Sequence, residues 1–175
     1  MLRLNEPTPP RGQRGVSTLE IAIVVAATAI VAALGVSMYR TYSVRAQVAT
    51  SVEEAAAAQH LVVAAFRKRG TPPTDAAEAG IDSSAGRFLA GSHVESLEIH
   101  NGRIELHFAA SASAAIAGKT LSLVPFETAD QDVVWICGNA PPGVGLEPLG
   151  FAGGAPQAAQ VSTQIEERYL PPSCR

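Results

Sequence analysis

The apolar residues follow three different patterns along the chain. Residues 21–39 carry no charge and are mostly apolar, with the sequence IAIVVAATAIVAALGVSMY. From Val44 to Phe66, apolar residues recur every three, four or seven positions, and later segments alternate apolar with polar residues. These patterns predict a helix that is apolar on every side, then an amphipathic helix, then a set of β-strands.

One continuous helix is predicted over residues 16–69, because no proline lies within this stretch. At a rise of about 1.5 Å per residue it would be about 80 Å long. Its charge-free part, about residues 21–39, would extend about 28 Å and match the hydrocarbon thickness of a membrane, so we expect it to span one. The second half should bury one stripe of side chains, formed by Val44, Val48, Val52, Ala55, Val62 and Phe66.

The predicted end of this helix carries three signals in succession. The basic triplet 67–69 suits the negative end of the helix dipole, and Gly70 suits a left-handed cap. The prolines at positions 72 and 73 prevent the helix from continuing. We therefore interpret the triplet as part of the helix end rather than as a ligand site, and we expect a loop over residues 70–92.

Four short antiparallel strands are predicted after this loop. Segments 94–100 and 103–108 alternate apolar with polar residues, and Asn101-Gly102 between them favours a type I′ hairpin turn. Two further strands are expected at 120–126 and 133–137. A sheet of this size can cover the apolar stripe of the helix with one face, so the predicted fold class is α+β.

The hairpin turn fixes which residues face each other across the first two strands. Ile99 would lie opposite Ile104 on the core side. On the other side Glu98 would lie opposite Glu105, and we expect this pair to be solvated rather than to bind a metal or exchange protons. The glycine- and proline-rich segment 138–156 that follows the fourth strand is not expected to hold a regular element unaided.

Composition and charge narrow the classes of function. Apolar residues make up 47% of the chain and aromatic residues only 5%, which suits thin helices and small sheets more than a large aromatic core. The net charge is −3 and no long basic run is present, so nucleic acid is not expected as the main partner.

An enzyme on a membrane anchor is the alternative from a different class. The histidines show no metal-ligand spacing, and no Ser/His/Asp or glycine-rich phosphate motif accompanies them. We therefore expect no catalytic residue, metal or cofactor, and we interpret four residues as surface or packing histidines: His60, His93, His100 and His107.

Cys137 and Cys174 are the two cysteines of the chain, and both lie in its last quarter. Metal and redox motifs place cysteines much closer together than these two, so a disulfide that closes the C-terminal region is the favoured interpretation. Such a bond requires an oxidising compartment outside the cytoplasm. Two unrelated buried thiols are the alternative.

The first 15 residues and the start of the apolar run form a recognisable pattern. Three arginines against one acid favour a cytoplasmic N-terminus. A secretory signal would place its small-residue cleavage site after the apolar run, whereas here Gly15 precedes it. Five residues later, Glu20 places a carboxylate at the start of the apolar helix. A charge near the membrane interior costs about 2.5–3.5 kcal/mol, so Glu20 is interpreted as functional, the alternative being an interfacial acid of a plain anchor.

A basic leader, a glycine and an apolar helix with a glutamate five residues later resemble the N-terminus of type IV pilins. The second half resembles the same family through motifs in the expected order: G-T-P-P-T-D…E-A-G, the hairpin N-G, GKTLSLVP, W-I-C and YLPPSC. The resemblance covers nearly the whole chain. Each motif is weak alone, but the N-terminal pattern and the five later motifs together make six in the expected order, which is specific.

The resemblance implies how the chain is processed and divided. Prepilin peptidase would cut after Gly15, Val16 would become the N-methylated N-terminus, and Glu20 would be the assembly glutamate. The leader would comprise residues 1–15, and an antiparallel-sheet head would comprise residues 93–175. The loop closed by the disulfide would run from 137 to 174.

The resemblance also implies partners and location. The subunit would sit in the inner membrane as a single-pass protein, then join a helical homopolymer through the pilus assembly machinery and become part of an extracellular pilus, or fimbrium. The filament would serve adhesion, twitching motility or DNA uptake, with a host surface or DNA as ligand. A pseudopilin of a type II secretion system is the alternative within the family, and the C-terminal cysteines favour the pilin.

Overall fold

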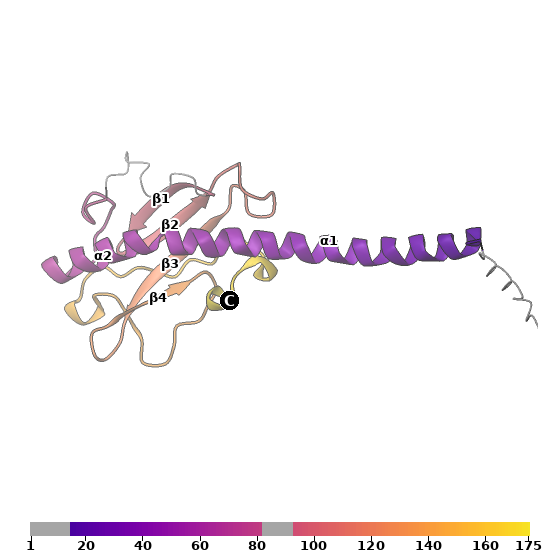
Figure 1. Cartoon of the computed structure of the whole chain (residues 1–175). Coiled ribbons are helices and arrows are strands. Elements are labelled where there is room, and N and C mark those ends of the chain that lie inside the picture. Colours follow the sequence, from indigo (N-terminus) through magenta and orange to yellow (C-terminus); the bar gives the residue numbers. More distant parts are fainter. Residues whose placement is uncertain (1–14, 82–92) are drawn as a thin grey trace, which may run out of the picture. The chain divides into compact units, whose positions relative to one another are not determined.

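The computed structural model describes residues 15–81 and 93–175 and comprises two units, Met1–Met38 and Tyr39–Arg175 (Figure 1). The first unit contains the beginning of helix α1, Thr18–Glu54. The second, here named the globular unit, contains the end of α1, helix α2 (Ala56–Arg69) and a sheet. The predicted loop 70–92 is described only as far as residue 81, so its remainder lies outside the described residues.

The helix predicted over residues 16–69 is present, with two differences. It begins at Thr18, and its regular assignment is interrupted at Ala55. The interruption is small, because Ala55 keeps helical dihedral angles (φ −69°, ψ −12°) and its amide still donates to the carbonyl of Ser51 at 3.1 Å. The Ser51 hydroxyl donates to the carbonyl of Gln47 at 3.0 Å, a side-chain bond of the kind that bends helices locally.

The buried stripe of the helix agrees with the predicted pattern. Val44, Val48, Ala55 and Val62 are buried, while Val52 and Phe66 pack against the core half-buried. Ser51 and Ala58 are buried too and were not predicted, because the apolar pattern was traced through the larger side chains. These small residues lie between the stripe positions. Their size allows the sheet to approach the helix closely.

The predicted helix end is confirmed. Gly70 has left-handed dihedral angles (φ 74°, ψ 2°), and its amide donates to the carbonyl of Phe66 at 2.7 Å. The residues that follow, Pro72 and Pro73, are both buried. The chain therefore leaves the helix through a turn that is packed against the globular unit.

The sheet is antiparallel with the order β1-β2-β3-β4. Its main strands are β1 (Val94–His100), β2 (Arg103–Phe108), β3 (Thr120–Glu127) and β4 (Val133–Cys137). Ile99 lies opposite Ile104 and Glu98 opposite Glu105, as predicted. The short strand β5 (Glu147–Pro148) pairs with β3 and was not predicted, because a two-residue strand depends on its partner rather than on its own sequence.

Side chains pack on both faces of the sheet. The main core lies between one face and the helix stripe (Figure 1). A second, smaller cluster on the other face contains Val124, Phe126 and Ala158, with Ile136 and Leu146 packed against it. The segment after β4 therefore forms a layer over β3 and β4, although it contains little regular structure.

This layer changes the environment of the hairpin face that was expected to be solvated. Glu98 is 53% exposed, as expected, but Glu105 is only 18% exposed. Arg103 lies beside Glu105 at 3.3 Å and donates a second bond to the carbonyl of Ala159 at 2.8 Å. The expectation was wrong for Glu105, because the returning C-terminal segment covers β2.

Gly102 occupies a position that should not tolerate a side chain. It lies in the hairpin turn with φ 86°, and a Cβ atom there would be 3.2 Å from Cβ of Pro72. Gly70 has a similar φ of 74° but open space around it. We expect Gly102→Ala to lower the free energy of unfolding by about 1–3 kcal/mol, and Gly70→Ala by about 1 kcal/mol. Urea unfolding of the detergent-solubilised protein measures both, and equal losses would contradict the packing argument.

Glu78 holds the turn after α2 in place. Its Oε2 atom accepts bonds from the Thr74 amide at 2.7 Å, the Thr74 hydroxyl at 2.9 Å and the Arg69 guanidinium at 2.8 Å. The Thr74 bonds, followed by the Arg69 contact, lower the pKa of Glu78 from 4.5 to about 2.

A depressed pKa means that the Glu78 carboxylate stabilises the folded turn above pH 4.5, and that this contribution disappears as the pH falls toward about 2. We expect the protection factors of the amides in residues 74–80, which correct for the pH dependence of intrinsic exchange, to fall over that interval, and Glu78→Gln to remove this fall. A side-chain carboxyl resonance of Glu78 that titrates near 4.5 would contradict this account.

Candidate assembly site

The described residues of the first unit expose an apolar surface on every side. From Val16 to Met38 all of them are exposed, and the large apolar side chains range from Ile21 (52%) to Met38 (77%). Such a surface is unstable in water and requires lipid or other apolar helices around it. Within the described part of the chain, the helical stretch Thr18–Arg69 is the one long and apolar enough to cross a membrane.

Ser17 caps the beginning of this helix. Its hydroxyl accepts a bond from the Leu19 amide at 3.3 Å, and its carbonyl accepts one from the Ile21 amide at 3.1 Å. Glu20 is the third helical residue, so Ser17 and Glu20 have the spacing of a capping box. Ser17 was not predicted as a cap, although the Ser-x-x-Glu spacing is a signal that could have revealed it.

Glu20 differs from all its neighbours in charge. It lies in the first turn of α1, where the helix dipole favours a carboxylate, and it is the sole charged residue from Val16 to Tyr39. Thr28, a polar residue of the same stretch, satisfies its hydroxyl within the helix by donating to the Val24 carbonyl at 2.8 Å. The apolar surface therefore carries one strong electrostatic group at its beginning.

Cys137 and Cys174 form a disulfide, as predicted, with their Cα atoms 4.6 Å apart. The alternative of two unrelated thiols is therefore wrong. Both cysteines are buried, and the Asn139 amide donates to the Cys174 carbonyl at 3.1 Å. A Cβ atom at Gly138 would lie 2.8 Å from that carbonyl, so the chain approaches the disulfide more closely than a larger residue would permit.

Side chains of the sheet and of the loop itself fasten the loop that the disulfide closes. The Ser122 hydroxyl donates to the Val161 carbonyl at 2.6 Å, and the Thr163 hydroxyl donates to the carbonyl of Thr120. The Gln160 amide group donates to the carbonyl of Ala140 at 2.8 Å. These bonds join segments far apart in the sequence, and they fix a loop that has almost no backbone ladder of its own.

The histidines do not gather into a metal centre. His100 lies 3.2 Å from Glu98, and His107 lies 3.7 Å from the other oxygen of the same carboxylate. His60 is exposed on α2, and the backbone carbonyl of His93 accepts a bond from the Ala109 amide. Across residues 15–81 and 93–175, no three His, Cys, Asp or Glu residues are grouped in a way that could hold a metal ion.

Comparison with known proteins gives one consistent result. The family model for pilins, described as "Pilin (bacterial filament)", matches residues 44–175. The fimbrial protein of Neisseria meningitidis serogroup A is 31% identical, over 93% of this chain and 94% of that protein. The type IV major pilin protein PilE of Neisseria gonorrhoeae is 29% identical over the same shares. The fimbrial protein EcpC of Eikenella corrodens is 27% identical, over 93% of this chain and 91% of its own length.

These matches agree with the architecture. The family match covers the amphipathic half of the helix, the sheet and the disulfide loop, and the relatives extend the similarity to nearly the whole chain. Pilins are structural subunits of bacterial filaments, so the anchored-enzyme alternative is wrong. The chain belongs to the pilin family and is a type IV pilin.

Proposed function

We propose that this chain is the precursor of a type IV pilus subunit and is inserted in the inner membrane. There it would lose residues 1–15 by cleavage, and the mature subunit would polymerise through α1 into an extracellular filament. The observation that carries this proposal is the apolar surface of residues 16–38, exposed on every side and bearing a single carboxylate at Glu20. A plain anchor would need the apolar surface but would gain nothing from the carboxylate.

The same surface suits both stages of the proposed life cycle. In the membrane it would be solvated by lipid, and in the filament by the helices of neighbouring subunits. The exchange of lipid for helix contacts keeps the apolar side chains out of water throughout. A disulfide in the globular unit supports its exposure to an oxidising compartment.

The matches favour a pilin over a pseudopilin of a secretion machine. The relatives compared above are named as fimbrial proteins or type IV major pilins, and they match this chain over almost their full length. Adhesion, motility and DNA uptake would all act through the globular unit, which the filament presents. The described residues of that unit contain nine Lys and Arg against thirteen Asp and Glu, so they give no net attraction for DNA.

Processing tests this proposal. Gly15 is the residue before the proposed cut, and we expect Gly15→Leu to leave the precursor uncleaved in the membrane and to remove surface filaments. The physical reason is that a peptidase site that accepts glycine closely has no room for a branched side chain. Mass spectrometry of the membrane fraction and of sheared filaments checks both outcomes. Cleavage at the wild-type level in Gly15→Leu would contradict the assignment of Gly15.

A further inference from the structure

Strand β4 (Val133–Cys137) lies at an edge of the sheet with unpaired main-chain groups. On β3, the Pro125 carbonyl accepts a bond from the Leu149 amide, so the main-chain groups of Pro125 point toward β5. The main-chain groups of the next residues in alternation, Val124 and Phe126, then point toward β4. They bond the main-chain groups of Ile136 and Val134. The N–H and C=O groups of Val133 and Trp135 consequently point away from the sheet, and they have no partner among the described residues.

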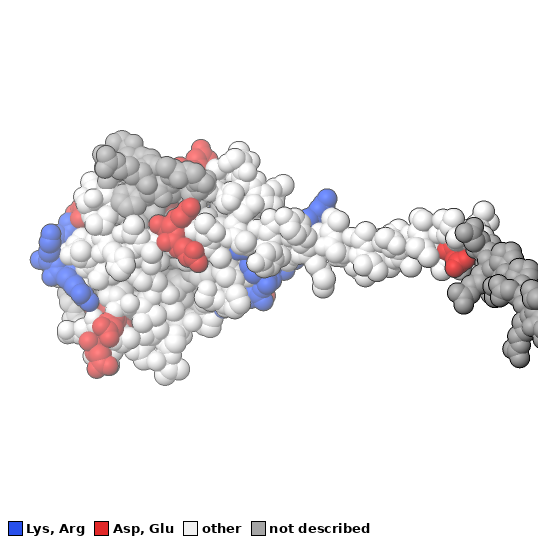
Figure 2. Space-filling view, in the orientation of Figure 1, with Lys and Arg blue, Asp and Glu red and all other residues white. Residues whose placement is uncertain are grey.

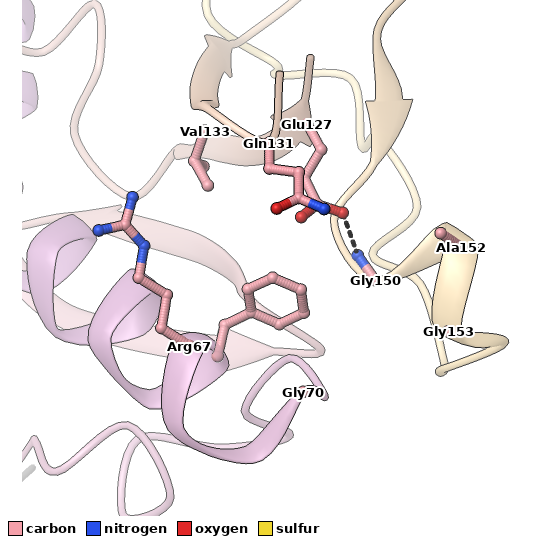
Figure 3. A pocket seen from close by; sticks show the side chains of 9 residues that line it. Arg67, Gly70, Glu127, Gln131, Val133, Gly150, Ala152 and Gly153 are labelled. Atoms are coloured by element: carbon pink, nitrogen blue, oxygen red, sulfur yellow. Dashed lines mark hydrogen bonds between the residues drawn. The ribbon is translucent and has the colours of Figure 1, made fainter. Parts of the chain in front are cut away.

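A groove runs along this open edge. It is named here the β4-edge groove, has a volume of about 440 Å³, and is lined chiefly by His60, Val63 and Arg67 of α2 and by Asp132, Val133 and Trp135. A hollow of about 310 Å³ adjoins it, shares Arg67 and Val133, and continues past Glu127 and Gln131 to residues 150–153 (Figure 3). Helix α2 thus forms one wall of a space beside a free strand edge.

This arrangement fits the addition of one more strand. An extended segment would bond the free groups of Val133 and Trp135, and its inward side chains would enter the groove against α2. The five residues of β4, VVWIC, carry no charge that would discourage such pairing. The open edge and the adjacent groove are separate observations that point to the same kind of occupant, an extended polypeptide.

Charge indicates which polypeptide fits. Arg67 lines the groove from α2, and Lys68 follows it in the last turn of that helix. Both are exposed and have no ion-pair partner among the described residues. Basic side chains gather at this end of the globular unit (Figure 2). The described part of the globular unit is acidic overall, with a net charge of −4. Arg67 makes the α2 wall of the groove basic, whereas Asp132 lies on the wall opposite. A second copy of the globular unit therefore brings an acidic surface to the basic α2 wall.

We propose that the β4-edge groove receives an extended segment from a second copy of this chain and so forms a contact between globular units in the filament. This inference rests on the proposed function. The contact joins two different surfaces, a free edge on one copy and a segment located elsewhere on the next. Contacts of that kind can repeat without closing, as a filament requires.

A cysteine placed in the groove tests the proposal, since the native cysteines are joined in a disulfide and leave no competing thiol. Val63→Cys reports on the groove, and Val144→Cys reports on a fully exposed site of the same unit. Each variant is labelled with a maleimide in sheared filaments and in detergent-solubilised subunits. We expect assembly to slow the labelling of Val63→Cys about tenfold or more, because a groove occupied about 90% of the time exposes the thiol only about a tenth of the time. The labelling rate of Val144→Cys should remain almost unchanged.

A second substitution tests the strand pairing. Val133→Pro removes an N–H that points away from β3 and leaves the bonds to β3 intact. Combined with Val63→Cys, it should restore labelling in filaments toward the solubilised rate, and protection that persists would overturn strand addition.

Several outcomes separate this inference from the proposed function. Filaments in which residues 63 and 144 label equally would overturn the groove contact and leave the proposed function standing. Protection of residue 63 in subunits that cannot polymerise would indicate a foreign peptide and overturn the second copy as occupant. Absence of the chain from surface filaments would contradict the proposed function itself.

Discussion

Glu20→Gln is expected to abolish surface filaments while the mature subunit accumulates in the membrane. After cleavage, the new amine of Val16 is a positive charge that must enter an apolar filament interior. Glu20 is the sole acid near it, either in the same helix or in a neighbouring subunit. A buried charge that loses its partner costs about 3–5 kcal/mol, which corresponds to roughly a hundredfold to a thousandfold or more in the association constant.

The substitution Glu20→Gln separates the charge of Glu20 from its role in capping the helix. Glutamine can still complete a capping box with Ser17, but it cannot neutralise an amine. If the charge matters, Glu20→Gln and Glu20→Ala lose filaments equally. Ser17→Ala should weaken the helix start by about 1 kcal/mol and leave filament yield nearly unchanged.

The yield of sheared filaments against membrane-bound mature subunit measures these effects. Removal of the charge lowers the cost of insertion, so the membrane pool should not shrink. Normal filament yield in Glu20→Gln would show that Glu20 is an interfacial or capping acid. Loss of the membrane pool would show a defect in insertion or folding.

Cys174→Ser is expected to destabilise the globular unit more than any other substitution considered above. The disulfide closes a loop with a sequence separation of 37 residues, and chain entropy assigns about 4 kcal/mol to such a closure. The loop contains one two-residue strand and short 3₁₀ turns, so its own hydrogen bonds cannot replace the covalent link. We expect a loss of about 2–5 kcal/mol in the free energy of unfolding, together with protease cleavage between residues 138 and 173.

Reduction of the wild-type protein provides the control. Because it breaks the same bond without changing a side chain, reduced wild type and Cys174→Ser should unfold at similar urea concentrations. Thr163→Val, which removes one bond between the loop and β3 and the bond that the hydroxyl accepts from the Ile165 amide, should cost only about 1–2 kcal/mol. A disulfide contribution no larger than that of Thr163 would contradict the view that the covalent link holds the loop.

Local signals made much of the fold predictable. The Asn101-Gly102 turn fixed the hairpin register, because both residues adopt positive φ values, 51° and 86°. The helix end at Gly70 and the buried stripe likewise depended on neighbouring residues. Such features need no knowledge of distant parts of the chain.

The layer over the outer face of the sheet could not be predicted in this way. It depends on bonds such as Arg103 to Ala159 and Ser122 to Val161, which join residues 56 and 39 positions apart. No periodic pattern marks residues 155–163, since single side-chain bonds to distant carbonyls hold them rather than a regular ladder. The assembly role of Glu20 was inferred from a family resemblance and from its isolation in an apolar stretch, and spacing alone would not have distinguished it from a helix cap.

Intact-mass analysis of the subunit from sheared surface filaments tests whether this chain is a processed filament subunit. We expect a single species that comprises residues 16–175, carries one N-terminal methyl group and retains the disulfide between Cys137 and Cys174. A filament subunit that retains residues 1–15, or filaments that lack this chain, would contradict this expectation.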